Sequence, residues 1–419
     1  MKTNEWLKKR RENALLAMEE DALLILYSGE AVPCSLDSCY PFQANRHFFY
    51  LTGLTRENMA LVLCTTEGKR REILFIEEAL PRDERWTGRR MRKEEAEEES
   101  GIADVRYLSD LPAFLSRCCV REGVGAVYFD CYRNAITDVE TYNLTAARQF
   151  HERYPAIPLK DAHPLISRLR MRKDESEIAE IRKAISHTKA GLDRVLMALR
   201  PGIRERDAQL QFEFTALLDG AEGLAFPTIA GAGANGCMLH YSENCAWLGD
   251  GDLLLLDLGA RSNGYCADIT RTYPVNGRYS ARQREFYDLV LKANREVAAF
   301  AAPGKTLKEL NERCKEVLVE GLMQLGKIDK PEDVATYYMH SVSHHLGIDT
   351  HDATVNETVP LEPGMVITDE PGLYIDEERI GIRIEDDLLI TEDGCVTLSD
   401  EIARNPEEIE ALMAEAGKK

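Results

Sequence analysis

The sequence predicts two domains, an α/β domain followed by a larger domain that combines helices with apolar strands. The 419 residues exceed what one small hydrophobic core organises, so two domains are expected. The first part alternates short apolar runs with helical segments, and the pattern changes near residue 170 to a basic connector. We therefore expect domains at residues 1–171 and 172–419.

The N-terminal domain is predicted to be α/β because apolar runs of strand length lie between segments with helical periodicity. The expected strands span residues 22–27, 48–51, 59–64, 73–76 and 126–129. The expected helices span residues 5–18 and 135–150.

The connector at residues 168–173 is basic, which predicts an exposed segment. Asp174 can cap the helix that follows, and Glu177 stands where a capping box requires an acid. An apolar stripe then continues until Pro201 and Gly202 end the helix. The stripe consists of Ile178, Ile181, Ile185, Leu192, Val195 and Leu199.

The composition excludes several classes of partner. No stretch approaches the roughly 20 consecutive apolar residues of a membrane-spanning helix, and acidic residues interrupt the segment where a secretory signal needs an apolar core. A formal net charge of −20 repels nucleic acid and anionic membranes. The 11 cysteines are odd in number and lack a CxxC pair, which favours reduced thiols. We expect a cytoplasmic protein without nucleic-acid or membrane partners.

The first acid pair lies in a predicted hairpin. An apolar strand at residues 253–258 contains Asp257, and after the turn at residues 262–264 a second strand runs through Asp268 to Tyr273. Pairing about the centre of that turn places Asp257 opposite Asp268. Opposed side chains have Cβ atoms about 5 Å apart, where like charges are destabilising unless a proton or cation lies between them.

A second hairpin repeats the arrangement near the C-terminus. Residues 366–370 and 380–390 flank a polar turn, and the pairing places Glu370 opposite Glu385. One such acid is ordinarily a turn, cap or ion-pair residue, but two hairpins with facing acids favour a metal site. Four carboxylates balance two divalent cations, which bridging carboxylates hold about 3.5–4 Å apart.

Histidines are concentrated between the two hairpins. Four of the nine histidines fall between His340 and His351, and this density beside acidic strands indicates ligation and catalysis. Mostly oxygen ligands with one imidazole favour Mn²⁺, with Co²⁺, Fe²⁺ and Zn²⁺ as alternatives.

The motifs around these residues resemble the metallopeptidases of the pita-bread fold, which include methionine aminopeptidase, prolidase, aminopeptidase P and creatinase. The motifs are LLLLDLGA, YCADITRTYPV, HSVSHHLGIDTHD, TDEPGLYI and GIRIEDD. The N-terminal stretches PFQANRHFFYLTGLTRENMALVL and ERWTGRRM resemble aminopeptidase P. The resemblance implies an α+β pita-bread (creatinase/aminopeptidase) catalytic domain preceded by a creatinase-like α/β domain.

The resemblance also implies a set of metal ligands for two divalent ions, most simply Mn²⁺. These ligands are Asp257, Asp268, His344, Glu370 and Glu385, with Asp268 and Glu385 bridging. The sequence departs from the family at His345, where a bulky apolar residue is usual, and at Ser341, where glycine is usual. Neither departure removes a ligand.

The remaining site residues follow from the same motifs. His340 would line the proline pocket, His240 would contact the substrate or the oxyanion, and His351 would stabilise the oxyanion. Arg383 would orient a ligand carboxylate with help from Tyr374, and its alternative role is an ordinary surface-strand ion pair.

The function implied is hydrolysis of the bond between an N-terminal residue and a penultimate proline. A metal-bridging hydroxide would attack the carbonyl carbon, and Glu370 would carry the proton to the leaving nitrogen. The partners would be peptides with proline at the second position, and relatives are commonly homodimers or homotetramers. The nearest alternative is a prolidase that cleaves only Xaa-Pro dipeptides.

Two other classes of function remain to be tested. Residues 231–236 satisfy GxGxxG after an apolar run, which would suit a dinucleotide-binding dehydrogenase if a helix followed. No helical stripe follows them in the sequence. A binding protein that keeps the peptidase fold without turnover is the other class, although such proteins usually lose ligands and none is missing here.

Overall fold

The computed structural model describes residues 3–356 and 358–416. The chain divides into two compact units, Met1–Arg170 and Met171–Lys419, one residue before the boundary predicted from the sequence. None of the described helices is both long and apolar enough to cross a bilayer.

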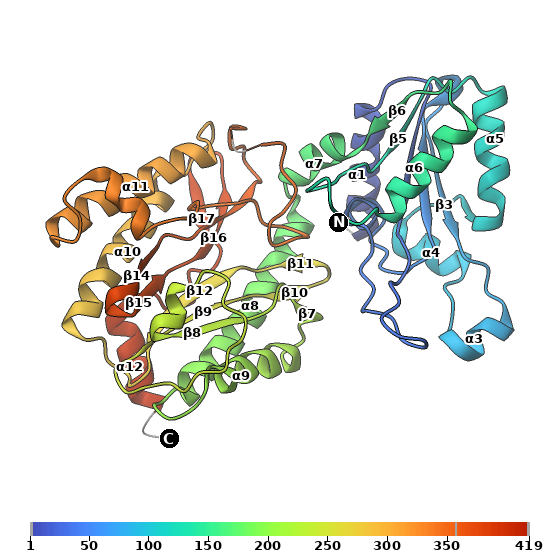
Figure 1. Ribbon diagram of the computed structural model, residues 1–419. Helices are drawn as coiled ribbons and strands as arrows, with labels where there is room; N and C mark the ends of the chain where they lie inside the picture. The colour runs from blue at the N-terminus through green and yellow to red at the C-terminus, as the bar shows by residue number, and fades with distance from the viewer. Residues whose placement is uncertain (1–2, 357, 417–419) are drawn as a thin grey trace. The chain divides into compact units, whose positions relative to one another are not determined.

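The N-terminal unit is built on a mixed sheet with strand order β4-β3-β2-β1-β5-β6 (Figure 1). Its strands are β1 (Ala22–Tyr27), β2 (Ala60–Cys64), β3 (Arg71–Ile76), β4 (Val105–Tyr107), β5 (Ala126–Phe129) and β6 (Leu159–Asp161). The helices up to the division are α1 (Thr3–Ala17), α2 (Arg46–Thr52), α3 (Pro81–Thr87), α4 (Lys93–Ser100), α5 (Leu111–Arg121), α6 (Tyr142–Arg153) and α7 (His163–Met171). Helices α5 and α6 pack on one face of the sheet through Phe114 and Phe150.

Two predicted elements of this unit are wrong. Residues 48–51 lie in α2 and not in a strand, because the Asn45 side chain accepts hydrogen bonds from the first backbone N–H groups and caps the helix. The helix is buried from His47 to Thr52, so its apolar run shows no helical alternation. The helix expected at residues 135–150 begins only at Tyr142, where the Thr141 hydroxyl accepts from Leu144 N.

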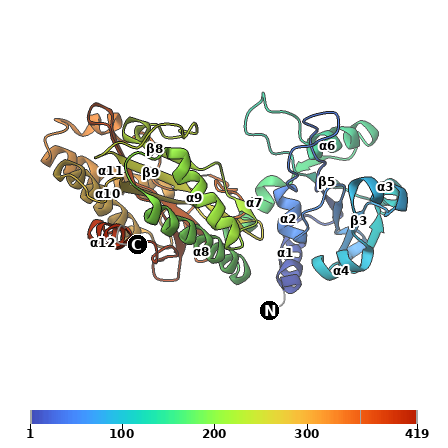
Figure 2. The same ribbon diagram turned by 90° about the horizontal axis from the view of Figure 1, so that it is seen from below.

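The C-terminal unit places apolar strands between two pairs of helices (Figures 1 and 2). The helices are α8 (Glu175–Ala198) packed on α9 (Glu205–Leu218), α10 (Ala281–Phe300) packed on α11 (Leu307–Gln324), and α12 (Pro406–Ala416). The central strands are β7 (Gly223–Leu224), β8 (Ile229–Ala232), β9 (Leu253–Leu258), β10 (Ala260–Ser262), β11 (Tyr265–Cys266) and β12 (Ile269–Pro274). The C-terminal strands are β13 (Val366–Asp369), β14 (Gly372–Ile375), β15 (Ile380–Arg383), β16 (Asp386–Ile390) and β17 (Cys395–Thr397).

The connector before α8 is only partly exposed, which contradicts the sequence prediction. Arg170 and Lys173 are 3% and 5% exposed, whereas Arg168 and Arg172 face solvent. A buried cation needs an anionic or polar partner, and Lys173 finds one in Asp352, which lies far away in the sequence.

The start of α8 follows the predicted capping box. Asp174 Oδ1 accepts from Ser176 N at 2.9 Å and from Glu177 N at 3.1 Å, and Glu177 Oε2 accepts from Asp174 N. The helix ends at Ala198, before Pro201 and Gly202.

We predict that Asp174→Ala lowers the free energy of unfolding by about 0.5–2 kcal/mol, because two backbone donors of α8 lose their acceptor. Urea denaturation followed by circular dichroism measures the change. The matched control is Arg182→Ala on the exposed face of the same helix, which should change the value by less than about 0.5 kcal/mol. Equal effects of the two substitutions would contradict the capping role.

Candidate active site

One cavity of about 700 Å³ in the C-terminal unit brings the predicted site residues together. The five proposed ligands, the three additional histidines and Arg383 all line it. These residues are Asp257, Asp268, His344, Glu370, Glu385, His240, His340, His351 and Arg383. Tyr374 contacts two of these residues, because its hydroxyl lies 2.9 Å from Arg383 Nη1 and 2.9 Å from His340 Nε2.

The register of the first hairpin differs from the prediction by two residues. Asp257 on β9 pairs with Thr270 on β12, and Asp268 precedes that strand. The turn centres on Asn263 and Gly264, both with positive φ, because Ser262 pairs with Tyr265. Side chains alternate along a strand with a period of two, so Asp268 and Asp257 are still on the same face, as diagonal neighbours.

The second hairpin keeps the predicted register but opens at the two glutamates. Asp369 pairs with Asp386 and Gly372 pairs with Arg383, which puts Glu370 and Glu385 at matching positions between the two ladders. Their backbone N–H groups bond elsewhere, from Glu370 to Val342 O at 2.9 Å and from Glu385 to Thr270 O at 3.0 Å.

His344 is oriented toward the acids of both hairpins. Its Nδ1 donates to His345 O at 3.1 Å, which leaves Nε2 as the lone-pair nitrogen. That Nε2 lies 3.4 Å from Asp268 Oδ2 and 3.5 Å from Glu370 Oε1. Asp268, His344 and Glu385 each offer a ligand atom within 4.8 Å of the others, a suitable spacing for one shared cation.

The acids repel one another strongly in this cavity. Burial, and then the charges of Asp257, Asp387 and Glu370, raise the pKa of Asp268 well above its ordinary value. Burial, and then the charges of Asp268, Glu370 and Asp257, raise the pKa of Glu385 in the same way. Burial also raises the pKa of Glu370. Carboxylates in this condition favour either protons or metal cations.

Asp257 offers an oxygen to the cavity. Its Oδ2 accepts from Arg383 Nη2 at 2.6 Å, whereas its buried Oδ1 has no hydrogen-bond partner among the described residues. Buried polar atoms are nearly always satisfied, so the free Oδ1 fits a ligand position. The donor set of carboxylate oxygens and one imidazole nitrogen therefore suits divalent cations.

Arg383 is an interior residue, which excludes the surface ion pair considered from the sequence. It is 4% exposed and bonds to Asp257, to the Tyr374 hydroxyl and, through Nε, to Thr270 Oγ1 at 3.1 Å. Its guanidinium thus fixes one carboxylate of the site and a tyrosine at once.

The polar network continues to His340. Tyr374 accepts from Arg383, so its hydroxyl proton is free for His340 Nε2, and His340 Nδ1 donates to Ser341 O at 2.8 Å. Burial, and then the charge of Arg383, lower the pKa of His340 to about 4. His340 is therefore neutral near pH 7, in the Nδ1–H tautomer.

Two threonines of the site were missed by sequence reasoning. Thr270 Oγ1 donates to Glu385 Oε2 at 2.6 Å, and Thr368 Oγ1 lies 3.4 Å from Glu370 Oε1. Each stands two residues from a proposed ligand, at positions 268 and 370, on the same strand face. This two-residue spacing was the sequence signal that could have identified both threonines.

The glycine-rich segment has no role as a dinucleotide site. Residues 231–236 continue from β8 into a 3₁₀ turn, Gly233–Cys237, and no α-helix follows. Its glycines allow close packing, because a Cβ on Gly231 would lie 2.7 Å from Asn235 O. The dehydrogenase alternative is therefore wrong.

Two further clusters of potential ligands lie in the N-terminal unit, and each already contains an arginine. Arg170 Nη1 lies 3.2 Å from His47 Nδ1 within the cluster His47, Asp130 and His163. Arg71 Nη2 lies 3.1 Å from Cys64 Sγ within the cluster Cys64, Cys118 and Glu122. The guanidinium supplies the positive charge in both clusters, which disfavours a metal ion.

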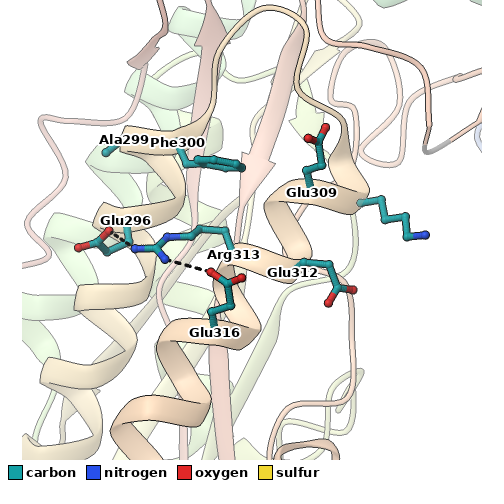
Figure 3. Close-up of a pocket in the computed structure, with 8 residues that line it drawn as sticks. Glu296, Ala299, Phe300, Glu309, Glu312, Arg313 and Glu316 are labelled. Atoms are coloured by element: carbon teal, nitrogen blue, oxygen red, sulfur yellow. Dashed lines mark hydrogen bonds and ion pairs between the residues drawn. The ribbon is translucent and has the colours of Figure 1, made fainter. Parts of the chain in front are cut away.

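A second cavity of about 700 Å³, between α10 and α11, shows that volume does not identify the active site. Figure 3 shows Arg313 directed at Glu296 and Glu316, and its nitrogens lie 2.8 Å and 3.0 Å from their oxygens. The side chains of these two acids are exposed and paired with one arginine, unlike the buried acids around His344.

Comparisons with known proteins agree with this geometry. The model of metallopeptidase family M24 matches residues 179–392, and that of the aminopeptidase P N-terminal domain matches residues 7–128. The Xaa-Pro aminopeptidase of Escherichia coli K12 is 35% identical over 98% of both chains. Human Xaa-Pro aminopeptidase 3 is 30% identical, over 94% of this chain and 82% of its own length.

Solved structures show the same fold. A structure from Bacillus anthracis, described as a candidate aminopeptidase P, superposes with a TM-score of 0.96 at 41% identity over 99% of both chains. Aminopeptidase P from Escherichia coli with the inhibitor Pro-Leu gives 0.89 at 33% identity, over 100% of this chain and 99% of that chain. The predicted fold class, a pita-bread catalytic domain after a creatinase-like domain, is confirmed. The chain therefore belongs to metallopeptidase family M24, in its aminopeptidase P group.

Proposed function

We propose that the protein is a dinuclear-metal aminopeptidase that hydrolyses the bond between an N-terminal residue and a penultimate proline. The observation that carries the proposal is the convergence of four carboxylates and the His344 imidazole on one cavity. The names of the full-length relatives support the substrate class, since they are Xaa-Pro aminopeptidases.

The five proposed ligands divide between the two metal ions, and two of the ligands would serve both ions. Asp268 and Glu385 would help to hold both ions, since each offers a ligand atom within 4.8 Å of the other and of His344. Asp257 would serve the second ion through its free Oδ1, and Glu370 would complete the first site beside His344. The oxygen-rich donor set supports Mn²⁺ as the metal.

A bound pair of divalent ions supplies an activated water and withdraws charge from the scissile carbonyl oxygen. Side chains of the protein would transfer the proton and stabilise the developing charge. Glu370 would carry a proton to the proline nitrogen, the leaving group, and His351 would donate to the oxygen that gains negative charge. Neutral His340, held by Tyr374, would line the pocket for the proline ring, and His240, which also lines the cavity, would contact the substrate.

Arg383 would act by holding Asp257 and Tyr374 in place. Its bonds to both are short, and the residue is buried. The cytoplasmic location and an assembly of two or four chains remain part of the proposal. The 11 unpaired cysteines support a reducing compartment.

The central test compares substrates of different length. We expect the Mn²⁺-loaded protein to release the first residue from Xaa-Pro-Yaa tripeptides and longer Xaa-Pro peptides, and a chelator followed by Mn²⁺ to abolish and then restore activity. Chromatography of the products measures the cleavage, and Xaa-Ala-Yaa peptides are the control. Turnover confined to Xaa-Pro dipeptides would make the protein a prolidase.

Substitution of Glu370 tests the proton carrier. We expect Glu370→Gln to lower kcat by about 10²–10⁴-fold, because the amide cannot accept and return a proton. The matched control, Glu377→Gln, removes an exposed carboxylate that pairs with Lys327 and should leave kcat within about twofold. Steady-state kinetics on one tripeptide measures both variants, and retained activity in Glu370→Gln would rule out this role.

Substitution of ligands tests the metal assignment. Wild type should hold two Mn²⁺ per chain by elemental analysis, as a pair of cations balances four carboxylates. Asp257→Ala should hold about one or fewer, because Asp257 supplies the free Oδ1. Arg383→Met should keep the metal but lose about 10–100-fold in kcat/KM through misplacement of Asp257. Full stoichiometry in Asp257→Ala would contradict its assignment.

A further inference from the structure

Lys173 and Asp352 form a buried ion pair next to the cavity. Both side chains are 1% exposed, and Lys173 Nζ lies 3.1 Å from Asp352 Oδ2. The ammonium also donates to Met171 O at 3.4 Å, and Lys173 N donates to Gly364 O at 2.8 Å. The lysine is therefore fixed at both its backbone and its side chain.

Asp352 holds the loop that carries the site histidines. Its backbone N–H donates to His345 O at 2.8 Å, and its Oδ1 accepts from Asp349 N at 3.4 Å. These bonds close the segment 345–352 into a compact loop with His344 before it and His351 within it. The rings of His344 and His351 lie with centroids 4.2 Å apart.

The loop passes so close to the ion pair that glycine is required. A Cβ on Gly347 would lie 2.3 Å from Asp352 Oδ2 and 2.9 Å from Lys173 Cε. Gly347 O in turn accepts from Cys266 N at 2.8 Å, which links the loop to β11, in the hairpin that ends before Asp268. The ion pair is therefore buried and packs directly against the loop.

We propose that Lys173 is a positioning residue, which holds Asp352 and thereby fixes the 345–352 loop so that His351 faces the substrate carbonyl. The kinetic consequence rests on the proposed function. Lys173 is not among the residues that line the cavity, whereas Asp352 is. Its effect on the reaction passes through the orientation of His351 and, next to the same loop, His344.

The kinetic test uses the double variant Lys173→Met/Asp352→Asn, which leaves no uncompensated buried charge. We expect kcat on a tripeptide to fall about 10–100-fold with KM within about threefold, since a displaced group slows chemistry more than binding. Adding His351→Ala to the double variant should lower kcat no more than about threefold further, because the pair acts through that histidine.

The structural test needs no catalysis. Hydrogen exchange followed by mass spectrometry should show amides of residues 345–352 exchanging at least about tenfold faster in the double variant, with β16 unchanged. The matched control is Lys189→Met/Asp193→Asn, a partly exposed i,i+4 pair on α8 with atoms 2.6 Å apart, which should change neither readout. Variants that fold as wild type allow both measurements.

Two results would overturn the positioning role. One is unchanged exchange in residues 345–352 of the double variant, and the other is a kcat loss that multiplies fully with that of His351→Ala. Faster exchange in a protein whose wild type cleaves no Xaa-Pro peptide would leave the positioning role standing and reject the proposed function. The two ideas are thereby separated.

Discussion

Mutual repulsion among four carboxylates in one cavity is the constraint on which the catalytic unit depends. The ion pairs of the described residues give neither Asp268 nor Glu385 a lysine or arginine partner, and the single guanidinium that reaches the group, Arg383, is engaged by Asp257. Carboxylates collected in this way lose hydration, and the bonds from Arg383 to Asp257 and from Thr270 to Glu385 compensate only part of that loss. Divalent ions that bind the folded chain and not the unfolded chain would remove that repulsion. Their binding free energy would then add to the free energy of folding.

The acids are held in place despite this repulsion by hydrogen bonds to their main chain and to adjacent side chains. Hydrogen bonds cross-link the two hairpins: Glu385 N donates to Thr270 O at 3.0 Å, and the Arg271 side chain donates through Nη1 to Glu385 O at 2.6 Å. Arg271 is fully buried and also pairs with Asp386 at 2.7 Å. The carboxylates themselves remain available for ligation because the main chain and adjacent side chains carry the structural bonds.

How far the sequence predicts this site depends on whether the information is local. The register of Glu370 and Glu385 was predictable because the polar turn between them is short. The start of the helix after Asp174 was predictable because its capping box is local in sequence. Asp257 was placed two residues out of register because the turn centres on the Asn263-Gly264 pair and not on the whole polar stretch. The helix at Arg46–Thr52 was missed because burial on all sides removes its periodicity.

Nonlocal partners explain what the sequence could not predict. A basic connector is read as exposed because lysine and arginine are seldom buried without partners, and the partner of Lys173 lies 179 positions away. A comparably long stretch of sequence separates Lys173 from the histidine cluster between His340 and His351. Four histidines in 12 residues indicate chemistry, yet the tautomers of His340 and His344 are set by the carbonyl oxygens of Ser341 and His345. Residue type therefore predicts which atoms are present, whereas tertiary contacts determine which of them can ligate or donate.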